Sequence, residues 1–216
     1  MIKQLLLPLT LLLFALSCSA QEEPMTYVAG KHYDLITKDV ARTASRDKIE
    51  VAEFFWYGCG HCFTFEPLVK EWKTELADDV EFRPIPAVWR DFMELHARAF
   101  YAAEALGVLD TLHPVIFQAM NVDRKRLDSE SEIKALFTAN GVSSDDFDKA
   151  FSSFGVGSQV RQAGSTAKSA GLTGTPSMMV EGKYLISTQK AGSQADMLKV
   201  VDFLVEKERA ARASAE

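Results

Sequence analysis

The chain has 216 residues, of which 47% are hydrophobic and 25% charged, and its formal net charge is -6. These values are typical of a folded protein and exclude a collagenous, low-complexity or wholly disordered chain. The excess of acidic residues argues against broad electrostatic binding to nucleic acid. Three cysteines are too few to form the framework of a disulfide-rich scaffold of this size.

Residues 1–20 have the pattern of a cleavable secretory signal peptide. Lys3 gives a positive start, residues 5–16 form an apolar run, and small residues lead into a polar segment. The run is shorter than the roughly 20 apolar residues of a transmembrane helix. We therefore expect cleavage after Ala20 and export, with two cysteines remaining. A lipid anchor on Cys18 and a retained N-terminal helix are the alternatives.

The first part of the mature chain, residues 21–90, contains a strand, a helix and a second strand. Residues 49–57 are rich in aromatic and apolar side chains, as in a strand that is buried on both faces. Apolar residues at helical spacing continue to Leu76, and residues 80–85 have the pattern of another strand. This order predicts two parallel strands joined by a helix.

Between residues 91 and 156 every predicted element is a helix. The first apolar stripe stops at Gly107, and a second stripe follows it. A third helix is predicted to start at Ser129, because Glu132 completes the spacing of a capping box. A fourth is predicted to start near Ser143. The sequence thus predicts an all-helical unit of four short helices.

Residues 157–216 return to a mixed pattern. A helix rich in alanine and serine runs towards Gly171, two short strands flank a turn at Gly182, and a final helix becomes polar and frays after Arg209. Together with residues 21–90, these elements predict an α/β fold whose two parts are separated by the helical unit.

The sequence Cys59-Gly60-His61-Cys62 follows the buried strand and opens the next helix. Cys59 is therefore expected at the helix N-terminus, where unpaired backbone N–H groups and the helix dipole favour negative charge. That position lowers the pKa of a thiol and makes its thiolate a good leaving group. Cys62, one turn later, is expected to be more buried and to keep its proton longer. A protonated His61 favours the Cys59 thiolate further.

Other uses of these cysteines fit the sequence less well. A zinc site needs about four ligands, and no second ligand pair occurs at a recognisable spacing. A c-type haem needs a histidine directly after Cys62, where Phe63 stands instead. A structural disulfide between Cys59 and Cys62 closes so small a loop that it restricts the unfolded chain little. The prediction is a redox-active dithiol that needs no metal or other cofactor.

Two features outside this motif agree with redox chemistry. If Glu53 is buried in its strand, desolvation raises the pKa of its carboxyl and lets it exchange protons with Cys62. An edge position that leaves Glu53 in water fits the strand equally well. Thr175-Pro176 has the pattern of a turn; a cis bond there is uncommon, but it could bring the Thr175 backbone beside Cys59 and expose an edge for an extended substrate.

The segment from Glu53 to Cys62, with Thr175-Pro176 far downstream, resembles the thioredoxin superfamily and, more closely, the DsbA family of periplasmic thiol:disulfide oxidoreductases. The likeness extends over nearly the whole mature chain. Further matching positions are residues 30–33, Glu66 and residues 181–184. The resemblance implies a thioredoxin fold with an inserted all-helical domain, in agreement with the split pattern described above.

The resemblance also implies roles for individual residues. Cys59 matches the exposed nucleophile, Cys62 its buried partner, and Glu53 the buried acid. Pro176 matches the cis-proline of the family, with Thr175 before it, and both are expected to bind substrate.

Other positions carry a less specific expectation. His61 matches the usual histidine of the family, whereas Gly60 stands where a proline is most familiar, and this difference concerns the redox potential more than the reaction class. Glu66 either joins a charge cluster beneath the active site or is simply solvated. Trp56 and Tyr57 are expected at the surface around the nucleophile, where substrate and a membrane partner bind.

The resulting prediction is a protein dithiol:disulfide oxidoreductase that works in the oxidase direction on exported, unfolded proteins with free cysteines. The resemblance implies a periplasmic location and reoxidation by a DsbB-like, quinone-linked membrane protein, and we expect a monomer. A reductase or isomerase of the same fold is one alternative. A non-catalytic chaperone or peptide-binding domain is another.

Overall fold

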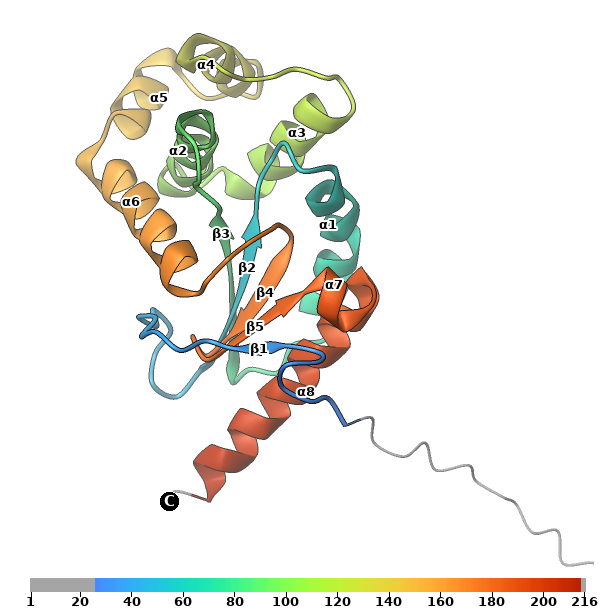
Figure 1. Ribbon diagram of the computed structural model, residues 1–216. Helices are drawn as coiled ribbons and strands as arrows, with labels where there is room; N and C mark the ends of the chain where they lie inside the picture. Colours follow the sequence, from blue (N-terminus) through green and yellow to red (C-terminus); the bar gives the residue numbers. More distant parts are fainter. Residues whose placement is uncertain (1–25, 215–216) are drawn as a thin grey trace, which may run out of the picture.

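The computed structural model describes residues 26–214. The predicted signal peptide, its cleavage after Ala20 and the lipid anchor at Cys18 lie outside the described residues. The described part contains a five-stranded sheet and eight helices (Figure 1). The strands are β1 (Asp34–Leu35), β2 (Ile49–Phe55), β3 (Val80–Pro86), β4 (Ser177–Val180) and β5 (Tyr184–Ser187). The helices are α1 (Gly60–Lys73), α2 (Asp91–Ala105), α3 (Leu109–Asn121), α4 (Glu130–Ala139), α5 (Ser144–Phe151), α6 (Phe154–Ser169), α7 (Thr188–Ala191) and α8 (Gln194–Ala213).

The strands are ordered β1-β5-β4-β2-β3. β2 and β3 are parallel and joined by α1, which confirms the predicted strand–helix–strand unit, and the other neighbours are antiparallel. All seven residues of β2 are buried, because a strand lies on each edge and helices cover both faces. The short elements β1 and α7 were not predicted; two and four residues are too few for a periodic pattern.

Alternate side chains of β2 enter two hydrophobic cores. Ile49 and Val51 belong to a core that is shared with α1 and α8. Ala52 and Phe54 belong to a larger core that is shared with helices α2 to α6. Because strand side chains alternate between faces, Glu53 points to the same side as Val51, towards α1.

The inserted helices α2 to α5 lie together at one end of the sheet, at the top of Figure 1. Their predicted signals are present: Gly107 has a positive φ of 69° just beyond α2, and the side chain of Ser129 accepts a hydrogen bond from the Glu132 backbone N–H at the start of α4. Ser143 caps α5 in the same way. The prediction of four successive helices is confirmed.

The next helix begins earlier than predicted. α6 starts at Phe154, where the side chain of Ser153 accepts the backbone N–H of Val156. The expected boundary between residues 156 and 157 therefore falls inside α6. This helix contacts α2 in the insertion as well as β3 in the sheet, so it joins the two parts.

The prediction that the last helix frays after Arg209 is wrong. α8 continues to Ala213, because its polar end is anchored by ion pairs: Arg209 lies 2.7 Å from Asp79, and Arg212 lies 3.0 Å from Glu181. Asp79 and Glu181 are distant in sequence from the end of α8, so the local polar composition suggested that this end of the helix had no stabilising contacts.

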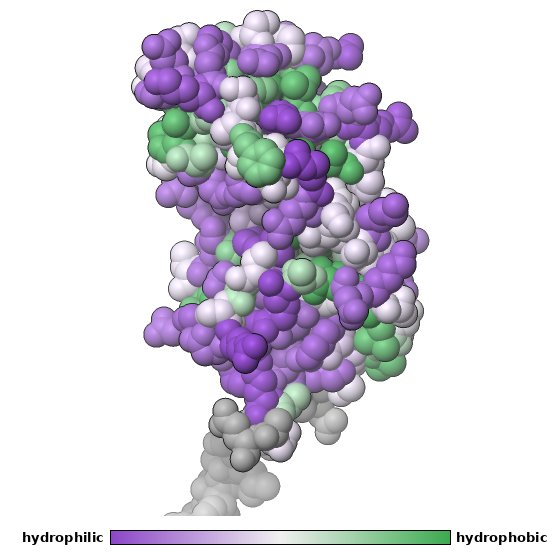
Figure 2. All heavy atoms as spheres, turned by 90° about the vertical axis from the view of Figure 1, so that its left-hand side faces the viewer, coloured by the Kyte–Doolittle hydropathy of each residue, from purple (hydrophilic) through white to green (hydrophobic). Residues whose placement is uncertain are grey.

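The side of the molecule that carries α5 and α6 is mainly hydrophilic, with separate hydrophobic patches (Figure 2). Within residues 26–214 there is no helix that combines the length and the apolar character needed to cross a membrane.

Candidate active site

Cys59 and Cys62 lie at the N-terminus of α1, just beyond the carboxyl end of β2. Cys59 is the N-cap residue and is half-buried, whereas Cys62 is fully buried in the first turn. Both are free thiols, so the structure represents the reduced dithiol. This arrangement agrees with the sequence prediction of one accessible and one buried cysteine.

The two thiols have opposite pKa shifts. A hydrogen bond from Cys62, another with the side chain of Thr175, and the backbone N–H groups of Cys62 and His61 lower the pKa of Cys59 to about 5, against the opposing effect of burial. Burial, followed by the hydrogen bond to Cys59, raises the pKa of Cys62 far above that of a free thiol. At neutral pH the pair therefore consists of a Cys59 thiolate and a protonated Cys62.

The Thr175–Pro176 peptide bond lies beside Cys59 and is cis. The carbonyl oxygen of Thr175 is 3.3 Å from Cys59 Sγ. Directly after Pro176, β4 begins and pairs with β2, so the sheet itself brings this segment to the start of α1. The cis bond and the close approach of the Thr175 backbone to Cys59, which the sequence left open, are both present in the fold.

Glu53 is buried in the middle of β2. Its side chain is 2% exposed, and its Oε1 atom has no hydrogen-bond partner among the described residues. Burial, and then the negative charge of Glu66, raise the pKa of Glu53, while Lys73 acts in the opposite direction. The alternative of an exposed edge position is therefore wrong, because β2 is an interior strand. Glu53 is a buried acid that holds its proton more tightly than an ordinary glutamate.

Glu66 connects this buried acid to the insertion. Its carboxylate lies 3.3 Å from Nε2 of His113 on α3, and Nδ1 of the same ring lies 2.8 Å from the hydroxyl of Tyr57. Glu66 therefore belongs to a charge cluster beneath the active site and is not merely solvated. Sequence reasoning missed His113, which lies in a helix predicted only for its apolar stripe.

The expectation that the Tyr57 side chain lies at the surface is wrong. Tyr57 is 1% exposed and packs edge-on against Phe117 of α3, because the insertion covers it. Trp56 is half-buried, and its indole N–H donates to Nδ1 of His96 at 2.9 Å. His61 is exposed, and its contribution to the lowered pKa of Cys59 comes from its backbone N–H.

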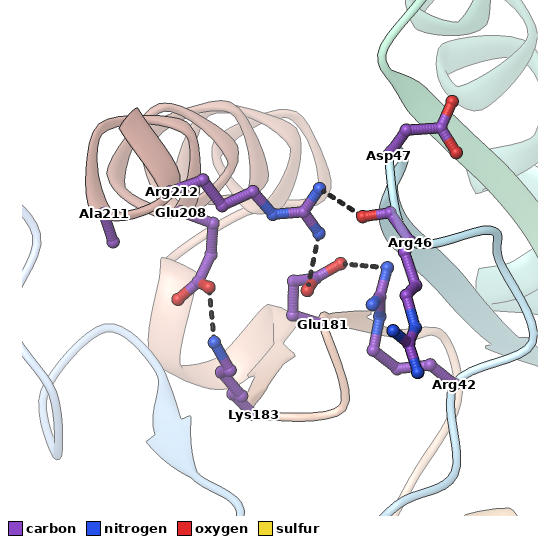
Figure 3. A pocket seen from close by; sticks show the side chains of 8 residues that line it. All are labelled: Arg42, Arg46, Asp47, Glu181, Lys183, Glu208, Ala211 and Arg212. Atoms are coloured by element: carbon purple, nitrogen blue, oxygen red, sulfur yellow. Dashed lines mark hydrogen bonds and ion pairs between the residues drawn. The ribbon is translucent and has the colours of Figure 1, made fainter. Parts of the chain in front are cut away.

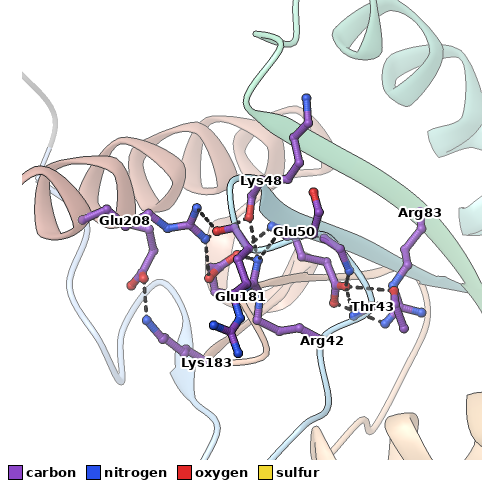
Figure 4. Close-up of polar contacts among 12 residues, drawn as sticks. Arg42, Thr43, Lys48, Glu50, Arg83, Glu181, Lys183 and Glu208 are labelled. Carbon is purple, nitrogen blue, oxygen red and sulfur yellow. Dashed lines mark hydrogen bonds and ion pairs between the residues drawn. The ribbon is translucent and has the colours of Figure 1, made fainter.

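A separate group of charged residues lies at the other end of β2 and lines the pocket in Figure 3. Glu181 accepts hydrogen bonds or ion pairs from Arg42, Arg212 and the backbone N–H of Glu50. The Glu50 carboxylate in turn accepts hydrogen bonds from the backbone and side chain of Thr43 (Figure 4) and from the backbone N–H of Ala44. These groups neutralise one another, so we assign the cluster a structural role.

No group of three or more histidine, cysteine, aspartate or glutamate side chains within residues 26–214 has the arrangement of a metal site. The reactive groups at the carboxyl end of β2 are instead a thiolate, a buried thiol and a buried acid. A dithiol at the start of the helix that follows a central strand, with a cis-proline beside it, defines a thioredoxin-fold thiol:disulfide oxidoreductase.

Comparisons with known proteins specify the family. The DSBA-like thioredoxin domain matches residues 50–199, and the chain belongs to this family. The thiol:disulfide interchange protein DsbA of Azotobacter vinelandii is 38% identical over 93% of this chain and 94% of its own length. The DsbA protein of Pseudomonas syringae is also 38% identical, over 94% of this chain and 93% of its own.

A solved structure gives the same result. The crystal structure of Pseudomonas aeruginosa DsbA has a TM-score of 0.82 and 35% sequence identity, and the match covers 87% of this chain and 97% of that one. The predicted family, the thioredoxin fold with a helical insertion and the oxidoreductase class are confirmed.

Proposed function

We propose that this protein introduces disulfide bonds into exported, unfolded polypeptides in the periplasm, with its own Cys59–Cys62 disulfide as the oxidant. The observation that carries this proposal is the opposite pKa shift of the two thiols. A fold that stabilises the Cys59 thiolate stabilises the reduced form relative to the disulfide, so the disulfide gives up its oxidising equivalents readily. The names of the DsbA relatives agree with this direction.

The reaction proceeds through two thiol–disulfide exchanges. A substrate thiolate attacks Sγ of Cys59, the Cys59–Cys62 bond breaks, and Cys62 leaves with the electron pair and takes up a proton. A second substrate thiolate then attacks the substrate sulfur of the mixed disulfide and expels Cys59 as a thiolate. The substrate gains one disulfide bond, and the protein gains two electrons and becomes the dithiol.

Glu53 is the proposed proton donor and acceptor for Cys62. Its raised pKa keeps a proton available inside the protein, where the leaving Cys62 thiolate would otherwise be a buried, unpaired charge. When the dithiol is reoxidised, the same carboxyl takes the proton from Cys62. No bound cofactor takes part in these steps.

Substrate binding is assigned to the residues around the nucleophile. The carbonyl oxygen of Thr175 borders Cys59, Pro176 follows Thr175 in the chain, and the half-buried Trp56 lies in the segment before Cys59. The buried Tyr57 packs beneath this segment, and we assign the exposed His61 a contact with substrate. We propose that a DsbB-like, quinone-linked membrane protein reoxidises the dithiol of a monomer. Unchanged reoxidation after Trp56→Ala would count against a contact there.

The test is a single-turnover oxidation. The oxidised protein is mixed with a reduced, unfolded polypeptide that carries one cysteine pair, and substrate disulfides are counted by thiol alkylation and mass spectrometry. We expect one substrate disulfide per protein molecule. Cys59→Ser and Cys62→Ser each remove one half of the Cys59–Cys62 disulfide, so both variants are expected to form no substrate disulfide. An oxidised wild-type protein that keeps its disulfide in the presence of this substrate contradicts the proposal.

A further inference from the structure

The segment that carries the nucleophile is a turn between β2 and α1. Residues 56–58, here called the active-site turn, are closed by the backbone N–H of Cys59, which donates to the carbonyl of Trp56 at 2.9 Å. The inserted helices contact this turn at both of its large side chains and at one carbonyl. The three contacting residues are His96 on α2 and His113 and Asn121 on α3.

His96 fixes the side chain of Trp56. The indole N–H can only donate, and it donates to Nδ1 of His96; Nε2 of the same ring lies 3.1 Å from the carbonyl of Leu127, which can only accept. One neutral tautomer satisfies both bonds, and burial lowers the pKa of His96 in favour of that neutral form. The Trp56 ring lies so close to Gly58 that a Cβ there would be 2.3 Å away.

Asn121, the last residue of α3, binds the backbone of the turn. Its Nδ2 donates to the carbonyl of Tyr57 at 2.8 Å and to that of Phe117 at 2.9 Å. Its Oδ1 lies 3.9 Å from the position of a Cβ on Gly60, the first residue of α1. His113 holds the Tyr57 hydroxyl at 2.8 Å, so both the main chain and the side chain of Tyr57 are fixed by α3.

We propose that the helical insertion is a positioning element for the nucleophile, and that His96, His113 and Asn121 are positioning residues that hold the active-site turn and with it the start of α1. This inference rests on the proposed role of Cys59 as the reacting sulfur. It assigns to the insertion an effect on the chemistry of a residue in the other part of the fold.

The physical link is the direction of the first backbone N–H groups of α1. Those of His61 and Cys62 contribute to the lowered pKa of Cys59, and a hydrogen bond of this kind weakens steeply when its angle or length changes. The turn immediately precedes these groups, so a turn that is free to move tilts them away from the sulfur. When the contacts from the insertion fix the turn, the N–H groups of His61 and Cys62 stay oriented towards the Cys59 sulfur.

The test compares Asn121→Ala with a matched control, Asn140→Ala. Asn140 lies at the end of α4, and its amide also donates to the carbonyl four residues earlier, at 2.8 Å from Leu136. The Cys59 pKa of the reduced protein is measured from thiolate absorbance, and the equilibrium with glutathione is measured alongside it. We expect Asn121→Ala to raise this pKa by about one unit, a tenfold change in the ratio of thiolate to thiol. The glutathione equilibrium shifts about tenfold towards the protein disulfide.

Circular dichroism establishes that each variant is folded. A folded Asn121→Ala with the wild-type Cys59 pKa overturns the proposal, and so does an equal shift in Asn140→Ala. If Asn121→Ala does not fold, Tyr57→Phe removes only the hydroxyl that contacts His113; a smaller rise in pKa is expected, and no change overturns the proposal. Because no substrate is present, failure of the proposed function appears separately, as absent substrate oxidation by wild-type protein.

Discussion

Two buried glutamates on the same strand show how differently this fold treats its two ends. Glu50 lies near the amino end of β2 and is 1% exposed; Glu53, three residues later, is 2% exposed. Strand, sheet and degree of burial are the same for both. What differs is the number of partners that the surrounding chain provides.

Both carboxylate oxygens of Glu50 accept hydrogen bonds. One carboxylate oxygen accepts the backbone N–H groups of Thr43 and Ala44 at 2.6 and 2.9 Å, and the other accepts from Arg83 at 3.2 Å. Burial alone would raise the pKa of Glu50, but these bonds outweigh it and the pKa is lowered. Glu50 is therefore an anion that fastens the segment before β2 to the sheet.

Among residues 26–214, no group donates a hydrogen bond to Oε1 of Glu53, and the pKa of Glu53 is raised by burial and by the charge of Glu66. An acid that is easily protonated contributes little to stability, but it can exchange a proton with a neighbouring thiol. Glu50 therefore serves stability, whereas Glu53, which has an oxygen without a hydrogen-bond partner in the described part of the chain, is electrostatically coupled to Cys59. Buried groups that lack partners are a recognised feature of reactive sites.

The largest effect should come from removing the supported carboxylate. Glu50→Ala leaves Arg83 and two backbone N–H groups without their partner, and we expect the free energy of unfolding to fall by about 3–5 kcal/mol. Urea denaturation of the oxidised protein measures it. Glu71→Ala, on the exposed side of α1, is the control and should change stability by less than about 0.5 kcal/mol. A Glu50→Ala protein as stable as wild type would show that the two ends do not differ in this way.

The next effect is on the pH dependence of the free energy of unfolding, which should have opposite signs for the two glutamates. Because the pKa of Glu53 is raised, the fold stabilises its protonated form, and this contribution is present below the ordinary value of 4.5 and is lost as the pH rises towards the folded-state pKa. Glu53→Gln does not ionise, so relative to wild type it gains stability with rising pH, by about 1.4 kcal/mol per unit of the original shift.

Glu50→Gln should show the opposite trend. The pKa of Glu50 is lowered, so its contribution is present above 4.5 and is lost as the pH falls through the folded-state pKa. Urea denaturation of the two glutamine variants and the wild type across this range measures both trends. Parallel pH curves for the two variants would contradict the comparison.

The smallest effect should come from Lys73, whose charge lowers the pKa of Glu53. Lys73→Met is expected to raise that pKa further by less than about half a unit, because Lys73 is exposed and its field is screened by solvent. Carboxyl-carbon NMR titration of Glu53 measures the change. Lys70→Met, which removes the other basic residue from the last turn of α1, is the control. A fall in the Glu53 pKa after Lys73→Met would mean that the charge acts in the other direction.

Local patterns were sufficient for much of this molecule. The strand that becomes β2, the dithiol at the start of α1 and the capping serines Ser129 and Ser143 are encoded within a few residues of where they act. Such signals depend on backbone dihedrals and short hydrogen bonds, which a single segment satisfies by itself. The spacing of Cys59 and Cys62 therefore indicated redox chemistry before any fold was known.

The sequence by itself predicted which of the two cysteines is accessible and where most of the helices and strands lie; only elements as short as β1 and α7 escaped it. Only the tertiary structure decided how that cysteine is surrounded: that β2 is interior and buries Glu53, that the insertion encloses Tyr57, and that Asn121 bonds a carbonyl 64 positions away. The physical reason is that burial and hydrogen bonding between distant segments depend on which surfaces meet, and no local periodicity records that.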